Sequence, residues 1–469
     1  MELHHPKPLW ALAFGKLWDT FSYYGTLTIL TLYLIHVFHL AQGNSYSIYG
    51  AYAALAYSMP ILGGIVADRW IGCRNALITG CVLNIVGNLM LVSFHRYFFC
   101  LGLATTLLGT GLYKGNALHL AGNLYPSGHD KKESGFTWIY VSINVGGMLG
   151  PLVYGFIVTY WGWNYGFLCS ALGITVGFIW LLLNLHTLEA YDKKLVHTNS
   201  TVYTSIYISI LLLIILISLP FYYYTQINFV IFVAFLVALL YIFASICRHH
   251  SEARKRLTAL IVFCFLAMFY FMAGLQTGAT VTLFIQHKIQ EGVIHTSLPA
   301  STFNTLYCLC VIVLAPLFVY LWKCLKRRNV VLLAPQKLVV GIVLALFGIT
   351  MFYVASVTSF VLLSIFLGYF LLSAGEVAIA PSAYTLISDL APIGMKGTMM
   401  GSWLLFIAMG GYLSSVLARL SHAIATFLPW HFAAFSGEFL VIDGFVLVTV
   451  ILTVLVNKGF LQKAISSLV

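Results

Sequence analysis

The sequence predicts an all-α polytopic membrane protein with fourteen transmembrane helices. Its 469 residues are 61% hydrophobic and only 8% charged, and the mean hydropathy is +0.95. Soluble domains carry roughly 25% charged residues because their surface faces water. A chain with about a third of that share must expose most of its surface to lipid. This composition excludes a secreted enzyme, a cytosolic regulator and a DNA-binding protein, despite a net charge of +11.

Fourteen apolar stretches are long enough to cross a hydrocarbon core of about 30 Å, which takes about 20 helical residues. The first six are 10–36, 46–67, 76–94, 97–121, 137–160 and 164–185. After a polar segment come two more, 203–222 and 227–247. The last six are 258–286, 299–322, 337–358, 360–387, 398–420 and 436–456. The first stretch has no small-residue cleavage site at its end, so we expect a helix there and not a secretory signal.

This order predicts an N-terminal six-helix bundle over 1–185 and a C-terminal six-helix bundle over 258–469. Between them lies a cytoplasmic linker, 186–257, which carries two extra transmembrane helices as an inserted hairpin. A weak internal repeat supports the two halves, because ADRWIGCRN (67–75) and LWKCLKRRN (321–329) occupy matching positions. We expect each to be a short basic turn on the cytoplasmic side.

Loop charge tests the helix count and gives the orientation. With the N-terminus inside, 19 of the 24 Lys and Arg residues fall in inside loops and termini, and three fall outside. Such a bias is typical of the positive-inside rule, and an error of one helix would destroy it. We therefore predict that both termini are cytoplasmic.

Several charged residues lie within the predicted spans, where each costs about 2.5–3.5 kcal/mol. Lys16 and Asp19 are three residues apart and so share one helix face. Lys114 and Glu376 lie deeper, in the fourth and tenth spans, and favour pairing around a wet cavity. Structural alternatives remain: Lys16 is near enough to its helix end to snorkel, and Asp19 can simply neutralise it. Asp443, in the last span, is interpreted as a surface or interhelix residue.

Polar uncharged side chains also occur at membrane depth. The hydroxyls of Tyr23, Tyr24 and Tyr57 each need a partner or a water there, and Asn144 and Asn304 raise the same question. Each of these side chains can serve an interhelical hydrogen bond instead of a ligand contact.

The nine cysteines are scattered and form no C-x-x-C pair, so neither a disulfide framework nor a metal site is predicted. No H-E-x-x-H or G-x-S-x-G motif occurs. We therefore expect a protein that is not an enzyme, with no catalytic residue, no metal and no cofactor.

Six motifs, in order along the chain, carry a family resemblance. They are FSYYG (21–25), PILGGIVADRWIG (60–72), GTGLYKGN (109–116), GFTWIYVSINVGGMLGP (135–151), GEVAIAP (375–381) and GTMMGSW (397–403). The chain resembles the proton-dependent oligopeptide transporters, the peptide-transporter branch of the major facilitator superfamily, in the bacterial form with two extra helices. The resemblance implies the major facilitator fold, two six-helix bundles around a central polar cavity. It also implies alternating-access import of di- and tripeptides with proton symport, by a functional monomer in the plasma membrane (the bacterial inner membrane).

The resemblance assigns roles to matching positions. Glu376 would face the ammonium group of a peptide, and Lys114 its carboxylate. The full set implied for substrate binding is Tyr23, Tyr24, Tyr57, Lys114, Asn144, Gln276, Asn304, Glu376 and Trp403. Proton coupling would involve Asp19, Lys16 and Lys114. Asp68, Arg69 and Arg74 would form a cytoplasmic gate. The expected partners are a small peptide, protons and the lipid bilayer, with no nucleic acid.

Several positions depart from the family pattern. The E-x-x-E-R motif of the first helix reads Lys16 to Thr20 here, and a second arginine aligns with Leu27. The acid of the seventh span is Gln276, and the histidine of animal members aligns with Gly50. The carboxylate-binding end has therefore lost cations, and the proton relay has lost acids.

These departures leave the transported solute and the coupling ion open. One alternative is the same fold carrying an amino acid or another peptide-like solute, with altered or absent proton coupling. Another is a sensor that transports nothing. If protons are coupled, Asp19 is the candidate carrier, because Glu376 is assigned to the substrate amine. The competing interpretation of Asp19 is a static pair with Lys16.

Overall fold

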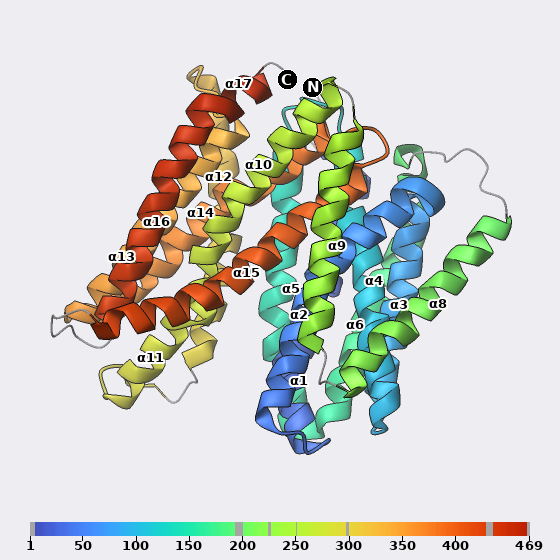
Figure 1. Ribbon diagram of the computed structural model, residues 1–469, viewed down its shortest axis with the longest axis horizontal. Helices are drawn as coiled ribbons and strands as arrows, with labels where there is room; N and C mark the ends of the chain where they lie inside the picture. Colours follow the sequence, from blue (N-terminus) through green and yellow to red (C-terminus); the bar gives the residue numbers. More distant parts are fainter. Residues whose placement is uncertain are drawn as a thin grey trace. The chain divides into compact units, whose positions relative to one another are not determined.

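The structure is a computed structural model that describes residues 5–192, 200–223, 227–249, 251–296, 300–427 and 435–466. All regular elements in these ranges are helices (Figure 1). The first group is α1 (Lys7–His36), α2 (Gln42–Val66), α3 (Gly72–Leu91), α4 (Arg96–Asn123), α5 (Lys132–Trp161), α6 (Trp163–Leu183) and α7 (Leu185–Leu188). The next are α8 (Ser200–Tyr223), α9 (Ile227–Arg248), α10 (Ser251–Gly274), α11 (Thr280–Gln290) and α12 (Asn304–Arg327). The last are α13 (Ala334–Val357), α14 (Val361–Leu390), α15 (Lys396–Phe427), α16 (Ser436–Val456) and α17 (Gln462–Ser466).

Fourteen of these helices are 20 residues or longer, and each overlaps one predicted span. Ten helical stretches in the described part of the chain are apolar enough to cross a membrane on hydropathy alone. α1 and α4 are not among them, because they carry the charged and polar residues of the interior. The predicted all-α multi-span fold is confirmed. The cytoplasmic placement of the termini stays a prediction.

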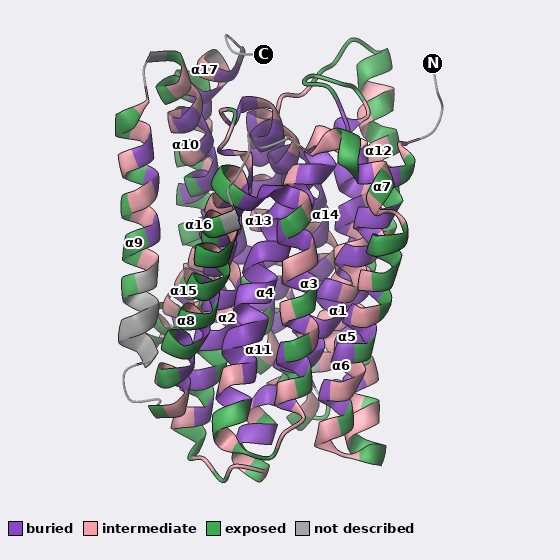
Figure 2. Ribbon diagram, turned by 90° about the vertical axis from the view of Figure 1, so that its right-hand side faces the viewer, coloured by how far each residue is buried: buried purple, intermediate pink, exposed green. Residues whose placement is uncertain are grey.

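Burial distinguishes interior helices from lipid-facing ones. Figure 2 shows α4 almost wholly buried, whereas α8 presents a long exposed stripe. That stripe contains Ile208, Leu211, Leu212, Ile215 and Leu216, at the i, i+3, i+4 spacing of one helix face. An exposed apolar face of this length is stable only against lipid.

The chain divides into two compact units, each described here by itself. Unit 1 comprises 1–254 and 387–405, and unit 2 comprises 255–386 and 406–469. In unit 1, α1 packs against α5 and α6, and α4 packs against α2 and α3. The inserted hairpin belongs to unit 1, where α8 lies on α4 and α9 lies on α2. In unit 2, α13 packs against α16. The division into 1–185, 186–257 and 258–469 stays a prediction.

The predicted basic loop at 67–75 is largely helical. α2 continues into a π-helical turn, η1 (Ala67–Ile71), and α3 begins at once with Gly72. Gly72 has φ +79°, and a Cβ there would lie 3.2 Å from an oxygen of Asp192. The backbone conformation favours glycine at this position, and a Cβ there would also crowd the Asp192 carboxylate. The reversal between α2 and α3 therefore uses no separate loop.

The ninth predicted span, 258–286, is not one helix, which corrects the sequence-based expectation. α10 ends at Gly274, a 3₁₀ turn follows (Leu275–Gly278), and Ala279 has φ −116° and ψ −104° before α11 begins. Two glycines bracket the turn, and glycine is a poor helix former. Hydropathy averaged over the length of a span does not reveal the break, because the turn is only four residues long and the stretch 252–290 around it is strongly apolar.

Candidate functional site

A buried ion pair lies on α1 in unit 1. Lys16 Nζ is 3.0 Å from Asp19 Oδ2, and each side chain is only 4% exposed. The i, i+3 spacing brings the two groups together on one face, as the sequence predicted. Lys16 is directed to its partner inside the protein and does not snorkel. A desolvated pair of this kind is costly to break, because the remaining charge would stay buried.

Lys114 on α4 lies in a cage of tyrosine rings. Its Nζ is 3.7 Å from the ring centroid of Tyr23 and 4.7 Å from that of Tyr57. The Tyr24 and Tyr57 hydroxyls are 3.0 Å apart, which closes the cage. Cation–π contacts of a desolvated ammonium contribute about 2 kcal/mol. The described residues give Lys114 no ion pair, so its charge is held by rings and can attract a carboxylate.

Close approach of α2 and α4 builds this cage. An added Cβ at Gly63 would lie 2.1 Å from the carbonyl oxygen of Gly111. Two glycines facing each other therefore let the two backbones touch, as small residues do in membrane helix pairs. This contact sets the distance at which Tyr57 meets Lys114.

Two further predicted residues of unit 1 are buried. The Asn144 amide donates to the carbonyl of Tyr140, one turn earlier in α5, at 3.0 Å. Trp403 lies on α15 and is completely buried. Of the predicted site residues in unit 1, the structure brings together Tyr23, Tyr24, Tyr57 and Lys114.

Glu376 on α14 heads a second polar cluster, in unit 2. Its carboxylate accepts a hydrogen bond from the hydroxyl of Tyr307 on α12. The Tyr270 hydroxyl is 3.4 Å from that of Tyr307 and donates to the carbonyl of Leu372. Sequence reasoning missed Tyr270 and Tyr307. Tyr307 had a usable signal, because it lies three residues after Asn304 and so shares its helix face.

Asn304 belongs to the same unit. Its side-chain oxygen accepts from Tyr369 at 3.1 Å, and its amide donates to Thr282 at 3.4 Å. The recorded contacts of Asn304 thus join α12, α14 and α11. They are interhelical hydrogen bonds, the structural alternative left open by the sequence.

Gln276 is fully buried in the turn between α10 and α11. Its amide donates to the carbonyl of Ser414 on α15 at 2.8 Å, and its oxygen accepts from Thr280 at 3.0 Å. Both ends of the side chain are therefore engaged by protein groups, which hold the broken helix in place.

Asp68 caps the N-terminus of α15 within unit 1. Its carboxylate accepts from the backbone amides of Gly397 (3.1 Å) and Thr398 (2.8 Å) and from the Thr398 hydroxyl (2.9 Å). Helix N-termini favour a negative charge in this position. Unit 1 also holds an ion pair between α5 and α14, because Lys132 Nζ lies 2.6 Å from Asp389 near the end of α14.

The two arginines predicted to act with Asp68 have other partners. Arg69 donates to the hydroxyl of Tyr241 on α9 at 3.1 Å. Arg74 lies 3.6 Å from Glu189. Asp192, which the sequence analysis did not single out, accepts from the backbone amides of Cys73 and Arg74 and so caps α3. These contacts tie the predicted gate loop to the inserted hairpin and to the segment after α6.

Comparison with known proteins gives matches over most of the chain. The sequence model of the POT family matches residues 74–432. The peptide transporter YePEPT of Yersinia enterocolitica is 27% identical over 449 residues, 88% of this chain and 87% of that protein. The uncharacterized transporter YclF of Bacillus subtilis is 28% identical over 435 residues, 89% of this chain and 88% of that protein.

Solved structures show the same fold. A POT family transporter in complex with a thioalcohol-conjugated peptide superposes with a TM-score of 0.75 at 23% identity, covering 98% of this chain and 97% of the other. A POT family transporter in complex with 5-aminolevulinic acid gives a TM-score of 0.73 at 23% identity, covering 99% and 98%.

Proposed function

The chain belongs to the POT family, and from this premise we propose that it imports di- and tripeptides by alternating access with proton symport. Membership confirms the family resemblance and the major facilitator fold expected from the motifs. The protein is a multi-pass membrane transporter and not an enzyme, because POT family proteins are transporters. The solute, the coupling ion, the membrane and the oligomeric state belong to the proposal.

The observation that supports a peptide substrate best is that each unit, taken by itself, holds one charged side chain among tyrosines: the buried Lys114 in unit 1 and the partly buried Glu376 in unit 2. Lys114 lies among tyrosine rings with no carboxylate partner in the described part of unit 1. Glu376 lies in unit 2 with tyrosine hydroxyls around it. As the family resemblance implies, Lys114 would bind a carboxylate and Glu376 an ammonium group, and a peptide carries both. Each charge would replace hydration that the bound group loses.

Binding would also use the uncharged residues assigned from the family motifs. Tyr23, Tyr24 and Tyr57 offer ring faces and hydroxyls around Lys114. Asn144, Asn304, Gln276 and Trp403 stay in the proposal as substrate-binding residues. The fully engaged amide of Gln276 favours a supporting position instead of direct contact.

Proton coupling is assigned to Asp19 with Lys16 and Lys114. Asp19 is buried, is paired with a cation, and shares the interior of unit 1 with Lys114. Protonation of Asp19 would release Lys16 and so change the charge balance of this interior. Gating is assigned to Asp68, whose contact with α15 must break and re-form in each cycle, with Arg69 and Arg74 supporting its turn. We place the transporter in the plasma membrane, as a functional monomer.

A second solute class is favoured by one observation. Lys16, Thr20 and Leu27 stand where the family has charged residues, so the basic end of the site differs from the usual pattern. An amino acid or another peptide-like solute, moved with altered or absent proton coupling, fits this change. A sensor that moves nothing is the remaining candidate.

The test is uptake of labelled dipeptides, tripeptides and free amino acids into proteoliposomes, with and without an inward proton gradient. We expect uptake of peptides but not of free amino acids, with accumulation only when the gradient is present. Uptake of amino acids in preference to peptides would favour the second solute class. Binding without uptake of any solute would favour the sensor.

A further inference from the structure

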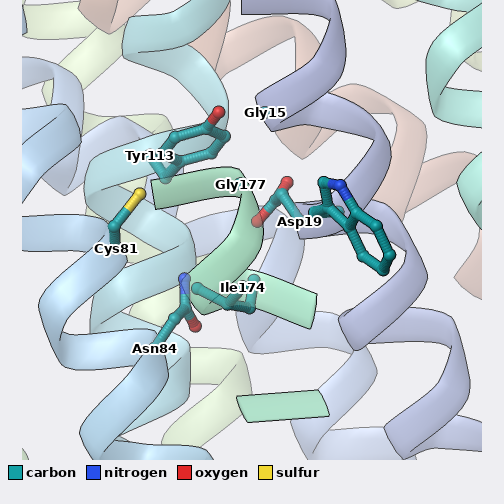
Figure 3. Close-up of a pocket in the computed structure, with 8 residues that line it drawn as sticks. Gly15, Asp19, Cys81, Asn84, Tyr113, Ile174 and Gly177 are labelled. Atoms are coloured by element: carbon teal, nitrogen blue, oxygen red, sulfur yellow. The ribbon is translucent and has the colours of Figure 1, made fainter. Parts of the chain in front are cut away.

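A small cavity lies among α1, α3, α4 and α6 of unit 1, close to the Lys16–Asp19 pair (Figure 3). Its walls are Gly15, Trp18, Asp19, Cys81, Asn84, Tyr113, Ile174 and Gly177. Its volume of ≈ 10 Å³ is about the space that the centre of one water molecule needs. The cavity is therefore too small for any organic ligand and large enough for a single water.

Three polar side chains of the wall have unused hydrogen-bonding capacity among the described residues. Asp19 uses Oδ2 for Lys16, and its Oδ1 has no hydrogen bond. The Tyr113 hydroxyl is buried and has no partner. The Asn84 oxygen accepts from Thr110, which leaves its amide protons available. In Figure 3 the Asp19 carboxylate and the Asn84 amide nitrogen both turn toward the space beside Tyr113.

Buried polar groups are almost always hydrogen-bonded, and an ionised one is the costliest to leave unsatisfied. A polar cavity of sufficient size satisfies such groups with water, typically through about three hydrogen bonds. We propose that this cavity binds one water molecule, which donates to Asp19 and accepts from Tyr113 or Asn84. Tyr113 and Asn84 are thereby positioning residues for the carboxylate that takes up the proton. This second part rests on the proposed proton coupling.

A metal ion does not fit this site. The Lys16 ammonium, 3.0 Å from the Asp19 carboxylate, already neutralises it. A metal cation in the cavity would be repelled by the positive charge of Lys16. The described residues contain no group of three or more metal-ligating side chains. A water, in contrast, carries no charge and offers both donors and an acceptor.

Water also suits both protonation states of Asp19. It donates to the carboxylate, and it accepts from the carboxylic acid once the proton has been bound. The Tyr113 hydroxyl can reverse its own direction by rotation, so the chain of hydrogen bonds survives the change. Within the described part of unit 1, the ionisable groups that interact electrostatically with Asp19 include Lys16, Tyr23, Tyr52, Cys81, Tyr113 and Lys114, and none of these is a carboxylic acid.

The water site is tested by infrared difference spectroscopy of the full-length protein in lipid, recorded in normal and in ¹⁸O-labelled water. We expect an isotope-shifted band of a buried water in the wild type. Cys81→Val adds about one methyl group to the wall and should remove the band, whereas Cys81→Ala, the matched control, should keep it. A wild type without the band, or a band that persists unchanged in Cys81→Val, would overturn the water site.

The positioning role is tested by transport. Tyr113→Phe should lower proton-driven accumulation roughly tenfold, while counterflow exchange falls far less. Tyr33→Phe, which removes another buried hydroxyl from unit 1 away from the cavity, should affect neither. Equal accumulation by the two variants would overturn the positioning role. If the wild type exchanges peptide but never accumulates it, the coupling proposal fails, and the infrared result alone then decides the water site.

Discussion

Glu376 is the single residue on which the peptide proposal depends most. It accepts a hydrogen bond from Tyr307, so its carboxylate is already oriented on α14. Glu376→Gln should lower apparent peptide affinity by more than tenfold, because losing one partner of a buried charge pair costs about 2–5 kcal/mol. Competition uptake in proteoliposomes measures this. Glu291→Gln, which changes an exposed glutamate of the same unit, should leave affinity unaltered. If Glu376→Gln binds peptide with wild-type affinity, Glu376 is not part of the substrate site.

Gly15 and Tyr113 form a steric pair that can be tested independently of transport. A Cβ at Gly15 would lie 2.2 Å from the Tyr113 hydroxyl oxygen, but 3.5 Å from the ring carbon that bears it. Gly15→Ala should therefore destabilise the protein by roughly 1–3 kcal/mol through overpacking. Thermal unfolding in detergent should show most of this loss restored when Tyr113→Phe is added. Additive effects of the two substitutions would contradict the contact.

At the scale of elements, the N-terminus of α15 depends on one carboxylate. Asp68→Asn keeps the shape of the side chain but loses the charge that two backbone amides and a hydroxyl share. A cap of this kind contributes about 0.5–2 kcal/mol, which is small against the stability of a whole domain. We expect normal insertion and folding with slower transport, measured as turnover in proteoliposomes.

Asp192→Asn is the control for this cap. It alters a carboxylate that also binds two successive backbone amides, those of Cys73 and Arg74, but at the start of α3. It should slow transport much less than Asp68→Asn. If Asp68→Asn transports at the wild-type rate, the charges of the loop at 67–75 serve only to orient the protein in the membrane.

The break between α10 and α11 makes a separate prediction for Gln276. Gln276→Leu would remove the bond to the Ser414 carbonyl and leave the Thr280 hydroxyl without its buried partner. An unsatisfied buried group costs about 1–3 kcal/mol, so thermal stability should fall clearly. Apparent peptide affinity of the remaining folded protein should stay within about twofold, because the amide is engaged by protein groups. A selective loss of affinity at unchanged stability would instead assign Gln276 to direct substrate contact.

For the whole molecule, the question is whether Asp19 couples transport to protons. Asp19→Asn should abolish accumulation against a gradient and preserve counterflow exchange, since exchange needs no net proton movement. Both can be measured on one proteoliposome preparation. Continued accumulation would place the proton site elsewhere. If the Lys16–Asp19 pair is only structural, Asp19→Asn should lose stability and exchange together, because it leaves Lys16 buried without its counter-charge.

The fold was largely predictable, because each lipid-crossing helix needs about 20 apolar residues and therefore leaves a hydropathy signal. The α1 ion pair was predictable too, since i, i+3 spacing alone brings Lys16 to Asp19. The turn at 275–278 was not, because its four residues lie within a long apolar stretch and the hydrogen bond that Gln276 makes there joins it to Ser414, far away in sequence. Tyr113 and Tyr307 were missed for a related reason. A tyrosine beside many others becomes informative only when the structure shows what its hydroxyl faces.

The cap on α15 has a consequence for how this family can be compared across species. Asp68 binds mainly the main chain of Gly397 and Thr398, and every residue type except proline supplies the same amide. Position 397 is restricted by space, because a Cβ there would lie 2.8 Å from Asn116 Oδ1 and 3.0 Å from Asp68 Oδ1. At position 398 only the hydroxyl bond of Thr398 to Asp68 depends on the side chain. Methods that infer contacts from correlated substitutions in aligned sequences would therefore record little for this cap, although Asp68 and Thr398 lie 330 positions apart in the chain.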